Sequence, residues 1–147
     1  MTNPNILPSD RARLMGVIDP DAYGTGTETT AWIAAEDFNN FLAVISAGTL
    51  GTSATLDAKI EEAEDGSGTN PQDLGKSIAQ LTQAGTDQSD KQALINFRAD
   101  ELSDGYTHVR VSMTVGTATS DAAAYLFGFD ARYEPATDAT SVDEIVS

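Results

Sequence analysis

The stretch ATLDAKIEE at residues 54–62 alternates apolar and polar side chains from Ala54 to Glu61. Ala54, Leu56, Ala58 and Ile60 fall on one face of an extended chain, and the residues between them are polar or charged. Alternation with a period of two is typical of a β-strand that has one buried face and one face in water. A helix would need apolar residues three or four positions apart, so this stretch predicts a strand.

Strand patterns recur about every ten residues, with Gly, Asp, Ser and Thr concentrated between them. The expected strands are 14–18, 29–34, 41–46, 54–62, 74–81, 93–98, 106–115 and 122–133. The expected turns and loops are 19–27, 36–40, 48–53, 63–73, 84–90, 100–105 and 116–121, of which 48–53 resembles a hairpin connection. About seven or eight strands at this spacing predict an all-β fold, a single antiparallel β-sandwich with a jelly-roll-like layout.

Three of these strands carry further information. The apolar run FLAVIS at 41–46 predicts a central, buried strand. In YTHVRVSMTV at 106–115 the alternation places Val109, Val111, Met113 and Val115 inward and His108 outward. In the last strand, Tyr125, Phe127 and Phe129 share one face.

The two ends of the chain lack this periodicity. Residues 1–13 are interrupted by Pro4 and Pro8 and predict an extended N-terminal arm. Residues 134–147 predict an acidic C-terminal tail with little to bury. We therefore expect a sandwich domain at residues 14–133, with both arms available to contact neighbouring subunits.

Composition excludes several classes of protein. The chain has 147 residues, 23 acidic and 8 basic, for a formal charge of −15, with one histidine and no cysteine. The absence of cysteine excludes disulfides, thiolate metal sites and a cysteine nucleophile. The negative charge argues against direct binding to nucleic acid or to an anionic membrane. No apolar run approaches a membrane span, and the N-terminus lacks the pattern of a signal peptide, so we expect synthesis in the cytoplasm.

Few residues could carry catalysis. His108 is the only possible imidazole base, and the G-x-S-x-G pattern of a nucleophilic serine is absent from the sequence. Neighbouring acids occur at Asp19/Asp21, Glu61/Glu62, Glu64/Asp65 and Asp100/Glu101, as expected by chance in so acidic a chain. We therefore predict no enzyme, no catalytic residue and no cofactor.

The loop at 63–73 carries a faint cation-binding pattern. Asp65 could begin an EF-hand loop, but its twelfth position is Lys76 instead of glutamate. We therefore predict no metal ligand. A calcium site formed by Glu64, Asp65 and Asp73 stays open as an alternative. The glycines at 24–26 and 48–51 fit neither dinucleotide-binding nor P-loop spacing.

Three stretches together resemble a family of proteins. They are FNNFLAVISAGTLGTSATLDAKIEEAEDGSGT at 38–69, DLGKSIAQLTQAG at 73–85 and YTHVRVSMTVGTATSDAAAYLFGFDARYEPA at 106–136. Their order is similar to that in small head-associated virion proteins of tailed phages and gene-transfer particles.

The resemblance implies a capsid decoration protein, also called a cement protein. Such a protein would bind the major capsid protein on the outer surface of the virion as a homotrimer, after assembly in the host cytoplasm. A neck or head–tail joining protein is one alternative. Another is a head fibre or carbohydrate-binding module that would use exposed aromatic side chains, for which the candidates are Trp32, Tyr23, Tyr106, Tyr125 and Tyr133.

Overall fold

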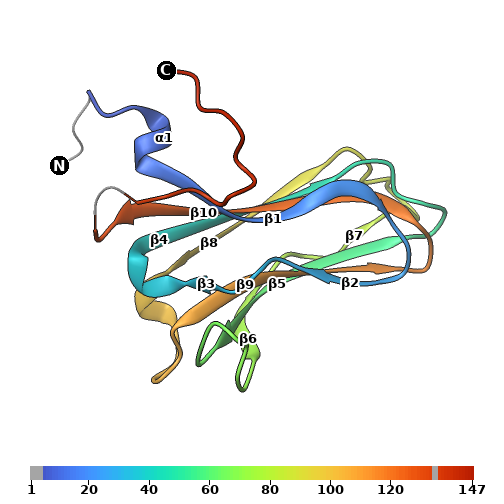
Figure 1. The fold of residues 1–147 in the computed structure, drawn as a ribbon. Helices are drawn as coiled ribbons and strands as arrows, with labels where there is room; N and C mark the ends of the chain where they lie inside the picture. Colours follow the sequence, from blue (N-terminus) through green and yellow to red (C-terminus); the bar gives the residue numbers. More distant parts are fainter. Residues whose placement is uncertain (1–4, 134–135) are drawn as a thin grey trace.

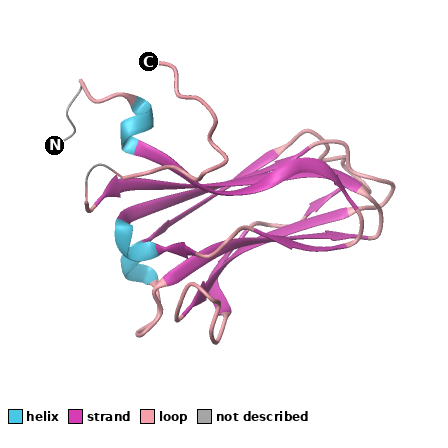
Figure 2. Ribbon diagram, in the orientation of Figure 1, coloured by secondary structure: helices cyan, strands magenta, loops and turns pink. Residues whose placement is uncertain are grey.

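The computed structural model describes residues 5–133 and 136–147 and shows two antiparallel sheets packed face to face (Figures 1 and 2). Sheet A has the order β1 (Ala12–Tyr23), β10 (Ser120–Ala131), β4 (Phe38–Ala47) and β8 (Gln92–Arg98). Sheet B has the order β2 (Gly26–Thr29), β9 (His108–Gly116), β5 (Thr55–Ala63) and β6 (Gln72–Ser77). The short strands β3 (Ile33–Ala34) and β7 (Leu81–Thr82) pair with β9 and β5. The predicted all-β antiparallel sandwich is confirmed.

The helical segments are short. They are α1 (Pro8–Arg11) and the 3-10 turns η1 (Ala35–Asp37) and η2 (Ala99–Glu101). Within the described residues, no helix is long and apolar enough to cross a membrane.

The order of the strands is that of a jelly roll. Because β2 and β3 both pair with β9, and β6 and β7 both pair with β5, the described strands occupy eight positions, four in each sheet. The chain changes sheet at each step between positions except from β5 to β6, which are neighbours in sheet B. Two Greek keys wound together produce this arrangement.

The core lies between the sheets and follows the predicted alternation. On β5, Leu56, Ala58 and Ile60 are buried, and on β9 the four residues expected inward are buried as well. Phe41 of β4 stacks on Phe97 of β8 with ring centroids 5.0 Å apart. Burial of one such side chain contributes roughly 1.5–3 kcal/mol, so this layer accounts for much of the stability.

The expected hairpin at Gly48–Ser53 is wrong. This segment carries the chain from β4 in sheet A to β5 in sheet B. A hairpin would join neighbours within one sheet, whereas most consecutive positions of a jelly roll lie in opposite sheets. The turn residues were recognised correctly, but the turn has a different role.

Other boundaries also differ from those expected. The strand expected at 29–34 is interrupted, because β2 ends at Thr29 and β3 covers only Ile33–Ala34. The turn expected at 19–27 is largely extended, because β1 continues to Tyr23 through an irregularity between Ile18 and Asp21. The polar turn expected at 36–40 is shorter, since β4 already begins at Phe38. The strand expected at 74–81 is interrupted, and its two parts are β6 and β7.

The free edge of β1 is covered by the chain's own C-terminal segment. The N–H of Ala139 donates to the carbonyl oxygen of Leu14 at 2.7 Å, and the N–H of Leu14 donates to Asp138 Oδ1 at 2.8 Å. Arg13 Nη1 lies 3.4 Å from Asp138 Oδ2. Residues 138–139 thus cover the edge of β1 at Leu14 through one backbone and one side-chain hydrogen bond, without forming a strand.

Candidate interaction surface

The outer face of sheet A is apolar. Two rows of outward side chains cross its four strands: Leu14, Phe127, Leu42 and Asn96 form one row, and Val17, Tyr125, Val44 and Leu94 form the other. Phe129 extends the surface toward the end of β10. We call the eight apolar members, Leu14, Val17, Leu42, Val44, Leu94, Tyr125, Phe127 and Phe129, the apolar face. Leu94 is 60% exposed, and the other seven are partly exposed.

Small residues on the inner side of β10 turn its aromatic side chains outward. Ala122, Ala124 and Gly128 are buried on that side. A Cβ at Gly128 would lie 2.6 Å from the ring of Phe38, which fills the space from β4. The aromatic side chains of β10 therefore occupy the opposite face, and Leu126 is the large side chain that points inward. Tyr125, Phe127 and Phe129 share one face as expected, and that face is the surface.

Charge is confined to the margin of this surface. None of the eight side chains in the two rows is charged, although the chain carries −15 in total. At the end of sheet A, Asp130 accepts a hydrogen bond from Asn40 Nδ2 at 2.7 Å. Arg98 lies 3.1 Å from Asp100. A carboxylate-free centre allows another protein to approach without placing an unpaired charge in the contact.

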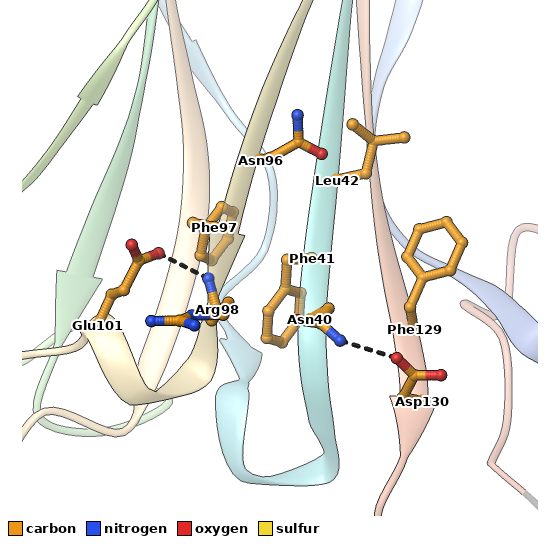
Figure 3. A pocket seen from close by; sticks show the side chains of 9 residues that line it. All are labelled: Asn40, Phe41, Leu42, Asn96, Phe97, Arg98, Glu101, Phe129 and Asp130. Carbon is orange, nitrogen blue, oxygen red and sulfur yellow. Dashed lines mark hydrogen bonds between the residues drawn. The ribbon is translucent and has the colours of Figure 1, made fainter. Parts of the chain in front are cut away.

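An open hollow of about 500 Å³ lies at this end of the apolar face (Figure 3). Its lining combines the rings of Phe41, Phe97 and Phe129 and the side chain of Leu42 with polar groups from Asn40, Asn96, Arg98, Glu101 and Asp130. Glu101 accepts a hydrogen bond from the backbone N–H of Arg98 at 2.7 Å. That hydrogen bond, followed by a smaller contribution from Lys76, lowers the pKa of Glu101 below its ordinary value.

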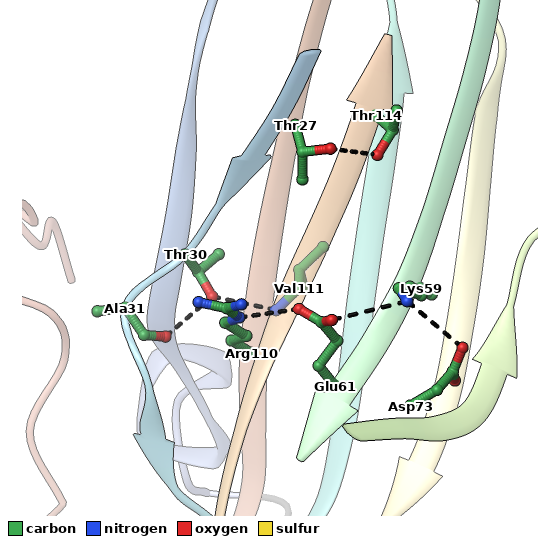
Figure 4. Close-up of polar contacts among 9 residues, drawn as sticks. All are labelled: Thr27, Thr30, Ala31, Lys59, Glu61, Asp73, Arg110, Val111 and Thr114. Carbon is green, nitrogen blue, oxygen red and sulfur yellow. Dashed lines mark hydrogen bonds and ion pairs between the residues drawn. The ribbon is translucent and has the colours of Figure 1, made fainter. Parts of the chain in front are cut away.

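The outer face of sheet B is polar (Figure 4). Arg110 Nε lies 2.9 Å from Glu61, Lys59 lies 3.6 Å from both Glu61 and Asp73, and the Arg110 guanidinium stands 4.3 Å above the ring of Trp32. A sheet face with such exposed ion pairs is typical of one that stays in water. The two faces of the sandwich are therefore chemically different.

His108 contacts its neighbour in the sequence, Thr107. Its Nδ1 lies 2.8 Å from the hydroxyl of Thr107, the preceding residue, and that hydroxyl donates to the carbonyl oxygen of Glu64 at 2.7 Å. The imidazole thus stands beside the 64–69 loop.

Neighbouring acids in the sequence separate in space. Glu61 points outward to Arg110, whereas Glu62 is 1% exposed and accepts hydrogen bonds from Gln72 Nε2 at 2.7 Å and from the N–H of Ser103 at 2.9 Å. Glu62 therefore ties β5 to β6 and to the loop before β9. These two carboxylates do not share a cleft.

The Asp65 carboxylate is occupied within its own loop. It accepts hydrogen bonds from the N–H groups of Ser67 at 2.9 Å and Thr69 at 3.1 Å and from the Thr69 hydroxyl at 2.7 Å. The Thr69 hydroxyl is the largest cause of the lowered pKa of Asp65. Asp73 instead faces Lys59. Across residues 5–133 and 136–147, no three His, Asp or Glu side chains converge as metal ligands.

The aromatic candidates for carbohydrate binding do not gather into one platform. Trp32 lies against Arg110 beside sheet B, whereas Tyr125 lies on the outer face of sheet A. Tyr23 donates its hydroxyl proton to the carbonyl oxygen of Asp19. Tyr133 is 76% exposed beyond the end of β10.

The apolar face was not identified from sequence, although one signal for it was present. FLAVIS is apolar at every position but the last, so both faces of this strand are apolar. The strand is central, as predicted, but only Phe41, Ala43 and Ile45 reach the core. Leu42 and Val44 contribute to the surface.

Comparison with known proteins identifies no family. No protein-family model and no curated protein matches the chain. Among solved structures, it is similar to the VP2 subviral particle of infectious bursal disease virus, with a TM-score of 0.46 and 16% identity over 86% of this chain and 36% of that one. The Gt strain of that virus gives a TM-score of 0.43 and 15% identity over 86% and 35%. The chain thus spans about a third of the length of these viral proteins, and the similarity concerns the fold.

Proposed function

We propose that this protein is a structural subunit of a tailed-phage virion that decorates the outer surface of the capsid and binds the major capsid protein through the apolar face. The observation that carries the proposal is an uncharged apolar sheet face on a chain of charge −15. The order of sequence segments that resembles head-associated virion proteins supports the choice of partner.

The size of the apolar face is near that of a binding surface. Each residue of a sheet face occupies about 4.8 by 6.6 Å, so the eight residues of the apolar face cover roughly 250 Å². Apolar patches of about 300–600 Å² are the largest on typical monomers and are often functional. Removing this area from water would contribute about 6 kcal/mol, toward the lower end of the 4–15 kcal/mol that association costs in lost freedom. One face alone therefore binds weakly, and additional contacts strengthen it.

The terminal segments can supply such contacts. α1 and the C-terminal segment both lie on the side of sheet A, beside β1 and β10 (Figure 1). Exposed apolar side chains occur on each of them, at Ile6, Leu7, Ile145 and Val146. The two arms would thus extend the contact that the apolar face begins.

The charge supports an outer position. A chain of −15 lining a shell packed with DNA would be repelled by the phosphates, whereas on the outside it faces solvent. The same charge would suit a neck channel, which is the second candidate. Copy number separates the two, because a neck ring holds a few copies and a decorated shell holds many.

The test is a binding assay with purified capsids that lack the protein. Phe127→Glu places a carboxylate in the centre of the apolar face, and Thr114→Glu places one on the outer face of sheet B as a matched control. Burying an unpaired charge costs several kcal/mol, and about 3 kcal/mol corresponds to a loss of affinity of about 100-fold. We expect this loss for Phe127→Glu, and near wild-type binding for Thr114→Glu.

Three outcomes would count against the proposal. Equal binding by both variants would show that the apolar face is not the contact surface. Undiminished binding after deletion of residues 1–13 and 134–147 would show that the arms do not contribute to the contact. The third outcome is a copy number measured by quantitative mass spectrometry of native particles. A decoration protein should match the number of major capsid proteins or a simple fraction of it. Only as many copies as one ring holds would instead indicate a protein of the neck.

A further inference from the structure

The outer edge of β8 offers unpaired backbone groups. The N–H of Ala47 on β4 donates to the carbonyl oxygen of Lys91 at 2.9 Å, and the register continues through Ala43 opposite Ile95. In an antiparallel pair, alternate residues bond to the neighbour and those between them point away. The odd-numbered residues of β8 thus bond to β4, and Gln92, Leu94 and Asn96 direct their N–H and C=O groups outward. The N–H of Arg98, at the end of the strand, is already bonded to Glu101.

Within the part of the chain that the structure describes, no strand pairs with this edge. Gln92, Leu94 and Asn96 are all exposed. Proteins usually protect a free edge with proline, charge, a bulge or a covering segment. The β1 edge has such protection, from residues 138–139 at one end and from Pro20 between two aspartates at the other. Between residues 92 and 96, β8 has neither a proline nor a charge.

We propose that β8 pairs with β8 of a second copy, antiparallel about a twofold axis at Leu94. The outward residues of β8 from 92 to 98 read Gln, Leu, Asn and Arg, and Asp90 lies in the turn before the strand with a φ of 61°. Around Leu94, this order sets Leu94 against Leu94 of the second copy. Gln92 then meets Asn96 twice, and each Arg98 comes to the end at which the other copy's Asp90 turn lies. An apolar pair and two amide pairs follow from a single register.

Neighbouring registers lose this match. A shift of two residues in one direction sets Leu94 opposite Asn96 and Gln92 opposite Arg98, so the apolar and amide pairs are both lost. A shift in the other direction sets Leu94 opposite Gln92 and leaves Asn96 without a partner on β8. Arg98 is free to change partner, because its pair with Asp100 is mostly exposed and contributes little.

The pairing also enlarges the apolar face. Two copies of sheet A would join into one continuous sheet, and two faces of roughly 250 Å² would lie side by side. Their sum of roughly 500 Å² is more than half of the roughly 800 Å² per partner of a standard interface. This last consequence rests on the proposed capsid binding, whereas the pairing itself does not.

Cysteine cross-linking tests the register, because the chain has no cysteine of its own. In the proposed pair, the Leu94 Cα atoms of the two copies lie about 5.5 Å apart, within disulfide range. Leu94→Cys should therefore form a covalent dimer on oxidation or with a short bis-maleimide. Gln92→Cys alone should not, but mixed with Asn96→Cys it should give the mixed dimer.

Sedimentation of the purified protein tests the pairing without a capsid, so its result is independent of the proposed function. The wild type should be a dimer. Asn96→Pro removes an outward N–H and no bond to β4, and should give a folded monomer, while Asn96→Ala keeps the N–H and should stay dimeric. A monomeric wild type, a trimer that Asn96→Pro leaves intact, or equal cross-linking through residues 92 and 94 would each overturn the inference.

Discussion

The contact between Gly128 and Phe38 provides the sharpest test of the packing beneath the apolar face. A Cβ at Gly128 would stand 2.6–2.7 Å from three carbons of the Phe38 ring, instead of the usual 3.5–4.0 Å. The ring is 1% exposed and meets Phe41 edge-on at 5.9 Å, so it has little room to move. Overpacking of this kind costs about 1–3 kcal/mol, of which a better strand propensity returns about 0.5–1 kcal/mol. We expect Gly128→Ala to lower the free energy of unfolding by about 1–2 kcal/mol.

A double-mutant cycle isolates this contact. Phe38→Ala alone should cost about 3–5 kcal/mol, because it leaves a cavity. In the double variant the methyl group enters that cavity without a clash, so the combined loss should be smaller than the sum by about 1–2 kcal/mol. Urea unfolding followed by circular dichroism measures all four free energies. Additivity within about 0.5 kcal/mol would refute the reasoning, because it would mean that the two side chains do not compete for space.

Three further predictions concern polar contacts. Glu62→Ala should lower the free energy of unfolding by about 3 kcal/mol, because the donors that surround Glu62 lose their acceptor. Glu62→Gln keeps the shape of the side chain and should lower it by only about 1 kcal/mol. Equal melting temperatures for the two variants would contradict this prediction. Because the pKa of Asp65 is lowered, its loop contributes stability above the ordinary aspartate pKa and loses this stability as the pH falls through the lowered pKa. Thr69→Val should raise the pKa of Asp65, which NMR titration measures. An unchanged pKa would refute the assignment of Thr69 as its main cause. Asp138→Ala should speed amide hydrogen exchange at Leu14 and Ala139, and protection as strong as in wild type would show that the tail is held by other contacts.

Much of the fold could be predicted from sequence, because period-two alternation reports burial directly. β5 and β9 each have one apolar and one polar face, and their inner residues were identified correctly. The connection at Gly48–Ser53 was misinterpreted because turn residues indicate a change of direction and not the sheet that the chain enters next. That choice depends on packing between distant strands, which local sequence does not encode.

The apolar face could not be predicted for a related reason. Alternation divides β10 into two faces, one with Tyr125, Phe127 and Phe129 and the other with Ala122, Ala124, Leu126 and Gly128. Hydrophobicity alone favours the aromatic face as the inner one. The outcome is decided by Phe38, which takes the inner space opposite Gly128, and that contact joins residues 90 positions apart in the chain.

The covering of the β1 edge has a consequence for how far assembly can grow. If both edges of sheet A were open, each copy could accept a neighbour on either side, and the sheets would extend into a fibril. Asp138 and Ala139 close one side, so a copy joined through β8 has no second site at which to continue. Removing residues 136–147 should therefore convert a self-limiting particle into an open-ended polymer, with concentration-dependent light scattering and thioflavin binding that the full chain lacks.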